Sequence, residues 1–118
     1  MTKKFERDLL RGSLDLMVLS VIAEDSQYGY SIQKRINSVS MGKIKLPAGT
    51  LYPLLHRLES DKLIRSRWET ATGRKRKWYD ITAKGKKRLT VQANLWQQYA
   101  GYMTNLIGGV VANPKPTS

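Results

Sequence analysis

The sequence contains no cysteine and only one histidine, His56, among its 118 residues. Disulfide bonds, thiolate metal sites and cysteine nucleophiles are therefore excluded, and one histidine alone does not make a metal site. No glycine-rich phosphate loop is present, because Gly108 and Gly109 follow no predicted strand, and no pair of carboxylates lies in an apolar setting. We therefore expect that the protein is not an enzyme and that it uses no metal and no cofactor.

Acidic residues and long apolar runs are also scarce. The apolar segment 14–23 is interrupted by Asp15 and Ser20 and is too short to cross a membrane, so we expect a cytoplasmic protein without a membrane partner. Nine Asp and Glu accompany 21 Lys and Arg, which gives a net charge of +12. All of this excess lies in residues 34–88. Such a block is typical of a surface that neutralises phosphates, with a solvated basic face or a patch for acidic membranes as the alternatives.

Apolar spacing predicts three helices in the first half of the chain. Residues 9–23 and about 29–39 repeat apolar residues at intervals of three and four, and a third helix opens at Pro47, which suits the first turn of a helix. The expected inward side chains are Leu10, Leu14, Met17, Val18, Val21 and Ile22, then Ile32 and Ile36, then Leu51, Leu54, Leu55 and Leu58.

The middle of the chain has the pattern of a β-hairpin. Residues 63–70 and 77–82 alternate in polarity, which predicts two strands. Residues 71–76 between them contain Gly73 and three cations, and we expect them to form a basic loop. Two helices, a third helix and a basic hairpin occur in the order of a winged helix-turn-helix, which makes the expected fold mainly α with a small β-hairpin.

The last part of the chain predicts one long helix. Thr82 is the expected N-cap, and the helix runs from there to about residue 110. From Trp96 onward its apolar residues follow steps of three and four, a heptad seam that predicts pairing with a second copy. We therefore expect a DNA-binding domain over 1–82, a dimerisation helix over 83–111 and a disordered tail over 112–118. The expected dimer contacts are Leu10, Leu14, Leu89, Trp96, Tyr99, Met103, Leu106 and Val110.

Several motifs, in the same order along the chain, resemble those of the PadR family of bacterial transcriptional regulators. The densest is Thr50-Leu51-Tyr52-Pro53 with Leu58-Glu59 and Leu63-Ile64, followed by Gly73-Arg74 and by Tyr79 before Thr82. The match covers roughly residues 10–89, and the single C-terminal helix is similar to the compact branch of the family, which includes multidrug-sensing members. The resemblance implies a homodimeric repressor at an inverted-repeat operator. The sequence departs from the family pattern at Lys62, where a glycine is usual.

The third helix is the expected recognition helix, whose first residues reach base edges in the major groove. We expect Thr50 and Arg57 to set sequence preference, whereas the basic run of the hairpin and the flanking lysines, Lys43 among them, hold phosphates. For Tyr52 the alternative is a ring that caps the core, and for His56 it is a solvated side chain. The candidate DNA-binding residues are Lys34, Arg35, Lys45, Ala48, Gly49, Thr50, Tyr52, Pro53, His56, Arg57, Arg74, Lys75, Arg76 and Lys77.

Two further interpretations concern partners. The resemblance to multidrug-sensing regulators implies a small aromatic effector that stacks on Trp96, with Tyr99 nearby, and the alternative is that both are ordinary interface residues. A winged-helix module that binds protein or RNA is the rival to an operator-binding regulator. The charged wing together with a self-pairing helix favours duplex DNA.

Overall fold

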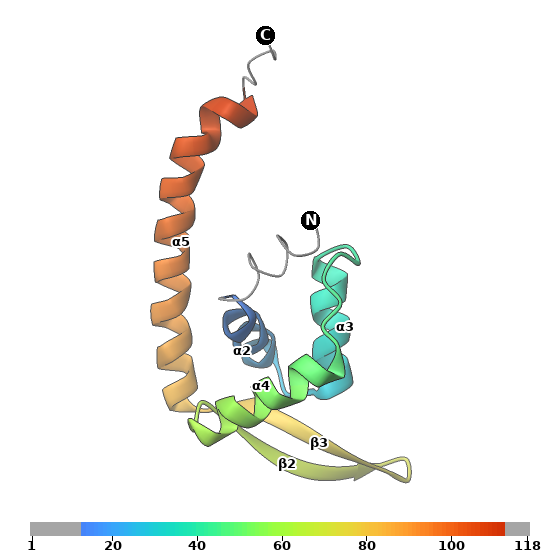
Figure 1. Ribbon diagram of the computed structural model, residues 1–118. Coiled ribbons are helices and arrows are strands. Elements are labelled where there is room, and N and C mark those ends of the chain that lie inside the picture. Colours follow the sequence, from blue (N-terminus) through green and yellow to red (C-terminus); the bar gives the residue numbers. More distant parts are fainter. Residues whose placement is uncertain (1–12, 113–118) are drawn as a thin grey trace.

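The computed structural model describes residues 13–112, which form four helices and three strands (Figure 1). Leu10, the predicted helical residues 9–12 and residues 113–118 of the predicted tail lie outside the described residues. The elements are α2 (Leu14–Glu24), β1 (Gln27–Tyr28), α3 (Gly29–Val39), α4 (Ala48–Ser60), β2 (Ile64–Ala71), β3 (Arg74–Ile81) and α5 (Ala83–Ala112).

One hydrophobic core joins α2, α3, α4 and the base of the hairpin. The four leucines predicted on α4 are all buried, as are Ile32 and Ile36 of α3, so the apolar faces of both helices are confirmed. Removal of such side chains from water stabilises the fold by about 1.5–3 kcal/mol each. The core residues are Val18, Leu19, Val21, Ile22, Ile32, Ile36, Leu46, Leu51, Leu54, Leu55, Leu58, Leu63, Ile64 and Tyr79.

The sheet has three antiparallel strands in the order β1-β3-β2. The strand β1 was not predicted, because residues 24–27 have the composition of a polar turn and a two-residue strand is too short to show alternation. Gln27 pairs with Tyr79 and Tyr28 with Trp78, so β1 attaches the beginning of α3 to the hairpin.

The predicted basic loop is wrong. Ala71 of β2 pairs directly with Arg74 of β3, so only Thr72 and Gly73 form the turn. Both have positive φ, 52° and 74°, as a type I′ hairpin turn requires. The four consecutive cations therefore lie in a strand, where neighbouring side chains point to opposite faces and their repulsion is reduced.

The junction between α4 and α5 is built from hydrogen bonds. Lys62 takes the positive φ of 63° that a glycine usually supplies, and its N–H donates to the carbonyl of Glu59 at 2.9 Å while that of Leu63 donates to Leu58 at 3.0 Å. The predicted N-cap is confirmed, since Thr82 Oγ1 accepts the N–H of Gly85 at 3.0 Å. The same hydroxyl donates to the Lys62 carbonyl at 2.7 Å and ties α5 to the end of α4.

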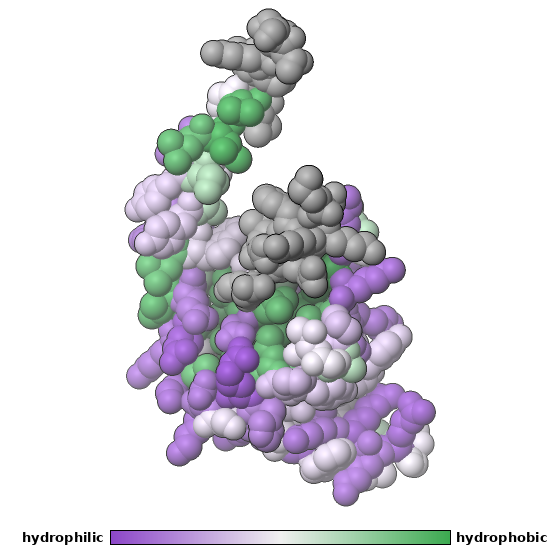
Figure 2. All heavy atoms as spheres, viewed as in Figure 1, coloured by the Kyte–Doolittle hydropathy of each residue, from purple (hydrophilic) through white to green (hydrophobic). Residues whose placement is uncertain are grey.

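The long helix α5 runs past the domain rather than over it. In Figure 1 it rises beside α2 and continues beyond the other described helices. Figure 2 shows hydrophilic side chains over the hairpin and the adjoining helices, and hydrophobic ones toward the far end of α5. The fold is the predicted winged helix-turn-helix followed by a long helix.

Candidate nucleic-acid interface

The outer face of α4 is open to solvent. The leucine stripe holds the helix against the core, which leaves the opposite face uncovered. All seven candidate DNA-binding residues of this helix are exposed: Ala48, Gly49, Thr50, Tyr52, Pro53, His56 and Arg57.

Tyr52 lies against the first residue of α3. A Cβ on Gly29 would overlap the hydroxyl and ring carbons of Tyr52, so the absence of a side chain at residue 29 lets the phenol approach. The Tyr52 side chain is nevertheless 49% exposed. One edge of the Tyr52 ring therefore packs against Gly29, while the rest of the side chain stays outside the core.

The cations of β3 are interleaved with aromatic rings. Lys75 Nζ lies 5.2 Å and Lys77 Nζ 5.9 Å from the centre of the Trp68 ring, on the face of the hairpin to which Tyr79 also belongs. On the other face, the Arg76 guanidinium lies 4.4 Å from the ring of Tyr28. Cation–π contacts of this kind hold long side chains in place at the surface.

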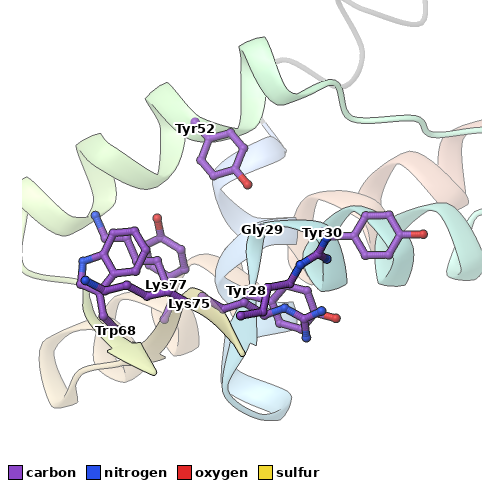
Figure 3. A pocket seen from close by; sticks show the side chains of 10 residues that line it. Tyr28, Gly29, Tyr30, Tyr52, Trp68, Lys75 and Lys77 are labelled. Atoms are coloured by element: carbon purple, nitrogen blue, oxygen red, sulfur yellow. The ribbon is translucent and has the colours of Figure 1, made fainter. Parts of the chain in front are cut away.

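A groove of about 630 Å³ separates α4 from the hairpin. Figure 3 shows Tyr52 directed into it from α4, with Trp68, Lys75 and Lys77 on the hairpin side. Of its five aromatic residues, sequence reasoning named only Tyr52 as a site residue and missed four. The alternation of β2 and β3 is a signal that relates Trp68 and Tyr79 to the lysines, but only the folded chain brings Tyr28 and Tyr30 alongside. The lining residues are Tyr28, Gly29, Tyr30, Tyr52, Trp68, Arg74, Lys75, Arg76, Lys77 and Tyr79.

Glu59 connects the end of α4 to the hairpin. Its Oε2 accepts the hydroxyl of Ser66 at 2.5 Å, and its Oε1 lies 3.9 Å from Lys77 Nζ. Burial raises the pKa of Tyr79 above its ordinary value of 10.0, and the charge of Glu59 and the neighbouring Tyr52 add to the effect. The buried, neutral phenol of Tyr79 therefore forms the base of the groove, beside Glu59, which pairs with Lys77.

Two of the predicted DNA-binding arginines have carboxylate partners. Arg57 Nη2 lies 2.5 Å from Asp15 Oδ1 on α2. Arg35 donates two hydrogen bonds to Glu24, at 2.9 and 2.8 Å, and this contact lowers the pKa of Glu24 and raises that of Arg35. These two guanidinium groups must exchange a carboxylate for a phosphate if they are to bind DNA.

The remaining candidates near α3 are exposed. Lys34 Nζ lies 5.8 Å from the ring centre of Tyr30, and Lys45 is exposed before α4.

A second pocket lies between α2, α3 and α5. Its volume is about 720 Å³, and Trp96 is the residue that α5 contributes. Tyr99 does not line it and instead packs edge-on against Tyr102, with ring centres 5.8 Å apart. The other lining residues are Ser13, Leu16, Met17, Ser20, Val21, Glu24, Arg35, Ile36, Val39, Ser40 and Ile44.

The apolar seam of α5 is uncovered in the single chain. Trp96, Tyr99, Met103, Leu106 and Val110 are between 54% and 78% exposed. Leu14 and Leu89, by contrast, are partly buried against the core of their own chain.

Two kinds of site are absent from the part of the chain that the structure describes. No three His, Cys, Asp or Glu residues there are grouped as a metal ion would require. No helix in that part is both long enough and apolar enough to span a bilayer.

Comparison with known proteins identifies the family. The profile of the Transcriptional regulator PadR-like family matches residues 18–91, which include the core, the exposed face of α4 and the whole hairpin. The chain belongs to the PadR-like family. Members of this family are transcriptional regulators and not enzymes.

Several relatives share most of their length with this chain. It is 31% identical over 94 residues to the transcriptional regulator Rv3488 of Mycobacterium tuberculosis, a match that covers 80% of this chain and 85% of the relative. A PadR family regulator from Eggerthella lenta superposes with a TM-score of 0.78 at 31% identity, over 90% of this chain and 91% of that one. A PadR-like regulator from Bacillus cereus gives 0.76 at 31% identity, over 85% and 96%.

Proposed function

We propose that this PadR-like regulator is a homodimeric repressor that binds an inverted-repeat operator in duplex DNA. The observation that carries the proposal is the exposed face of α4 beside the cations of β3, on a chain whose long helix leaves an apolar seam uncovered. Thr50, Tyr52 and His56 are close enough to the start of α4 to meet base edges or phosphates in a major groove.

The dimer is supported by the seam of α5. Five large apolar side chains at heptad spacing are exposed together, and a second copy of the same helix would cover them. Because Leu14 and Leu89 pack on their own core, we assign the main contact to the segment from Trp96 to Val110. A twofold pair would place two recognition helices about 34 Å apart, one turn of DNA, which is the reason to expect an inverted repeat.

We also propose that a small, flat aromatic ligand releases the repressor. The support is Trp96, whose indole lies at the wall of the largely apolar pocket between α2 and α3. A ligand there would weaken DNA binding only if it prefers a dimer in which the recognition helices are differently spaced, and by no more than that preference.

Operator binding is tested by selection from random duplexes followed by fluorescence anisotropy with the full-length protein. We expect an inverted repeat, two chains per duplex, and at least about tenfold weaker binding of an isolated half-site. A Thr50→Ala variant should lose preference among sequences more than it loses affinity for random DNA. Tighter binding of single-stranded RNA than of any duplex, or equal binding of one half-site by one chain, would contradict the proposal.

The ligand is tested with 1-anilinonaphthalene-8-sulfonate, an anionic aromatic dye whose emission rises in apolar sites. We expect enhanced emission with the wild-type protein, a loss of that enhancement in Trp96→Ala, and weaker operator binding when the dye saturates the protein. Retained emission in Trp96→Ala would place the dye elsewhere and remove the support for Trp96.

A further inference from the structure

The inner face of the hairpin carries an exposed tryptophan. Trp68 on β2 is 59% exposed, although its position directly opposite Lys77 puts it beside α4 rather than at the tip of the wing. Trp68 lines the groove together with Tyr30 and Tyr52, and contiguous exposed apolar groups of this kind are characteristic of surfaces that a partner covers. A basic strand that only faces solvent does not explain why a large apolar indole is exposed at this place.

The same face presents two lysines in fixed positions. Lys75 and Lys77 are two residues apart on β3, so both point to the side of Trp68, and both ammonium groups lie within 6 Å of its ring centre. Lys77 also lies 3.9 Å from Glu59, and among the described residues no acid pairs with Lys75. The indole holds the two charges in a row, and Lys77 must exchange Glu59 for a phosphate when it binds.

The opposite wall of the groove supplies a phenol. Tyr52 is placed there because Gly29 has no side chain, and its exposed edge faces the hairpin across the groove (Figure 3). The groove thus has a hydroxyl on one side and, among the cations on the other, two lysines that flank an apolar ring. A sugar–phosphate strand has the matching sequence of groups, since each apolar deoxyribose lies between two anionic phosphates.

We propose that this groove binds one sugar–phosphate strand of duplex DNA. Lys75 and Lys77 contact successive phosphates, Trp68 packs against the deoxyribose between them, and the Tyr52 hydroxyl donates to a phosphate oxygen. The proposal rests on DNA binding as proposed above and names the residues that grip the backbone. It makes Trp68 a determinant of affinity and not of sequence preference. Arg76 also lines the groove, but it packs on Tyr28 and the proposal gives it no phosphate contact.

The test uses full-length protein and anisotropy with operator and random duplexes over a salt series. We expect Trp68→Ala to weaken binding to both duplexes about fivefold without changing the salt slope, because no charge is lost. Lys75→Gln should reduce the slope of log K against log salt by about one. Lys86→Gln, which removes an exposed charge on α5 away from the groove, is the matched control and should leave the slope unchanged.

A spectroscopic measurement makes the result independent of the stability of Trp68→Ala. In a Trp78→Phe/Trp96→Phe background, Trp68 is the sole tryptophan, and we expect its emission to change when DNA binds and its accessibility to iodide to fall. Unchanged emission and quenching with saturating DNA, or wild-type affinity in Trp68→Ala, would overturn the groove proposal while DNA binding stands. Failure of the wild-type protein to bind any duplex would instead refute the proposed function.

Discussion

The guanidinium of Arg57 on the recognition helix α4 is paired with the carboxylate of Asp15 on α2, with 2.5 Å between nitrogen and oxygen. Both side chains are about half exposed, so the pair stabilises the fold by less than about 1 kcal/mol. Its consequence concerns binding, because an arginine held by a carboxylate must leave it to reach a phosphate or a guanine edge.

Asp15→Asn is therefore expected to tighten DNA binding. The variant releases Arg57 and removes a negative charge near the interface, so affinity should rise about threefold at low salt, with little change in the free energy of unfolding. Anisotropy and urea unfolding measure the two effects. Weaker binding by Asp15→Asn would show that the pair orients α4 and that Arg57 acts through that orientation.

Charges placed in the α5 seam are expected to separate the dimer. Met103→Glu/Leu106→Glu puts carboxylates where two helices would bury apolar side chains, and repulsion adds to the desolvation cost. Sedimentation should then give the 13.5 kDa of a single chain, and operator affinity should fall at least about tenfold. Gln98→Glu, on the same helix but off the seam, is the control. A wild-type protein that already sediments as one chain would contradict the dimer itself.

Gly85→Ala is expected to destabilise the junction between the domain and α5. A Cβ at this residue would overlap the carbonyl of Leu63, so the helix or the segment just before β2 must shift, at a cost of about 1–3 kcal/mol. Gly101→Ala is a matched control on the same helix, where a Cβ meets nothing and should stabilise the helix by about 1 kcal/mol. Guanidinium unfolding at fixed protein concentration measures both. Equal effects of the two changes would refute the close approach.

Lys62→Gly is expected to stabilise the protein by about 1 kcal/mol, because a left-handed backbone strains every residue with a Cβ. Lys62→Ala loses the same charge but keeps the strain, so it should give no such gain. Thermal unfolding of the three proteins separates the two causes. A gain in Lys62→Ala equal to that in Lys62→Gly would assign the effect to charge.

Alkaline stability is expected to depend on Tyr79. Its pKa in the folded protein is raised by burial, by Glu59 and by Tyr52, so the folded state favours the neutral phenol. This contribution is complete below the unfolded pKa of 10.0 and is lost as pH rises through the higher folded value. Tyr79→Phe should therefore unfold less steeply with pH above 10 than the wild type. In the exposed-site control Tyr30→Phe the wild-type slope should persist.

Local patterns in the sequence are sufficient to predict the main helices and which of their faces are buried. The spacing of Leu51, Leu54, Leu55 and Leu58 predicts the buried face of α4. The residues between these leucines must then form its exposed face. The Thr82 hydroxyl marked the start of α5, because capping depends on residues three positions apart. The net charge and its concentration in one segment indicated a polyanionic partner, since neither depends on how the chain folds.

Relations between distant residues were decided only by the tertiary structure. The Arg57–Asp15 and Arg35–Glu24 pairs join residues 42 and 11 positions apart, and no local pattern selects one carboxylate over another. The sequence predicts a loop for the basic run because its charge density resembles turn composition, whereas pairing with β2 and the rings of Trp68 and Tyr28 keeps the run in a strand. Periodicity reports how a segment divides between apolar and polar faces, and only packing determines which side chains those faces meet.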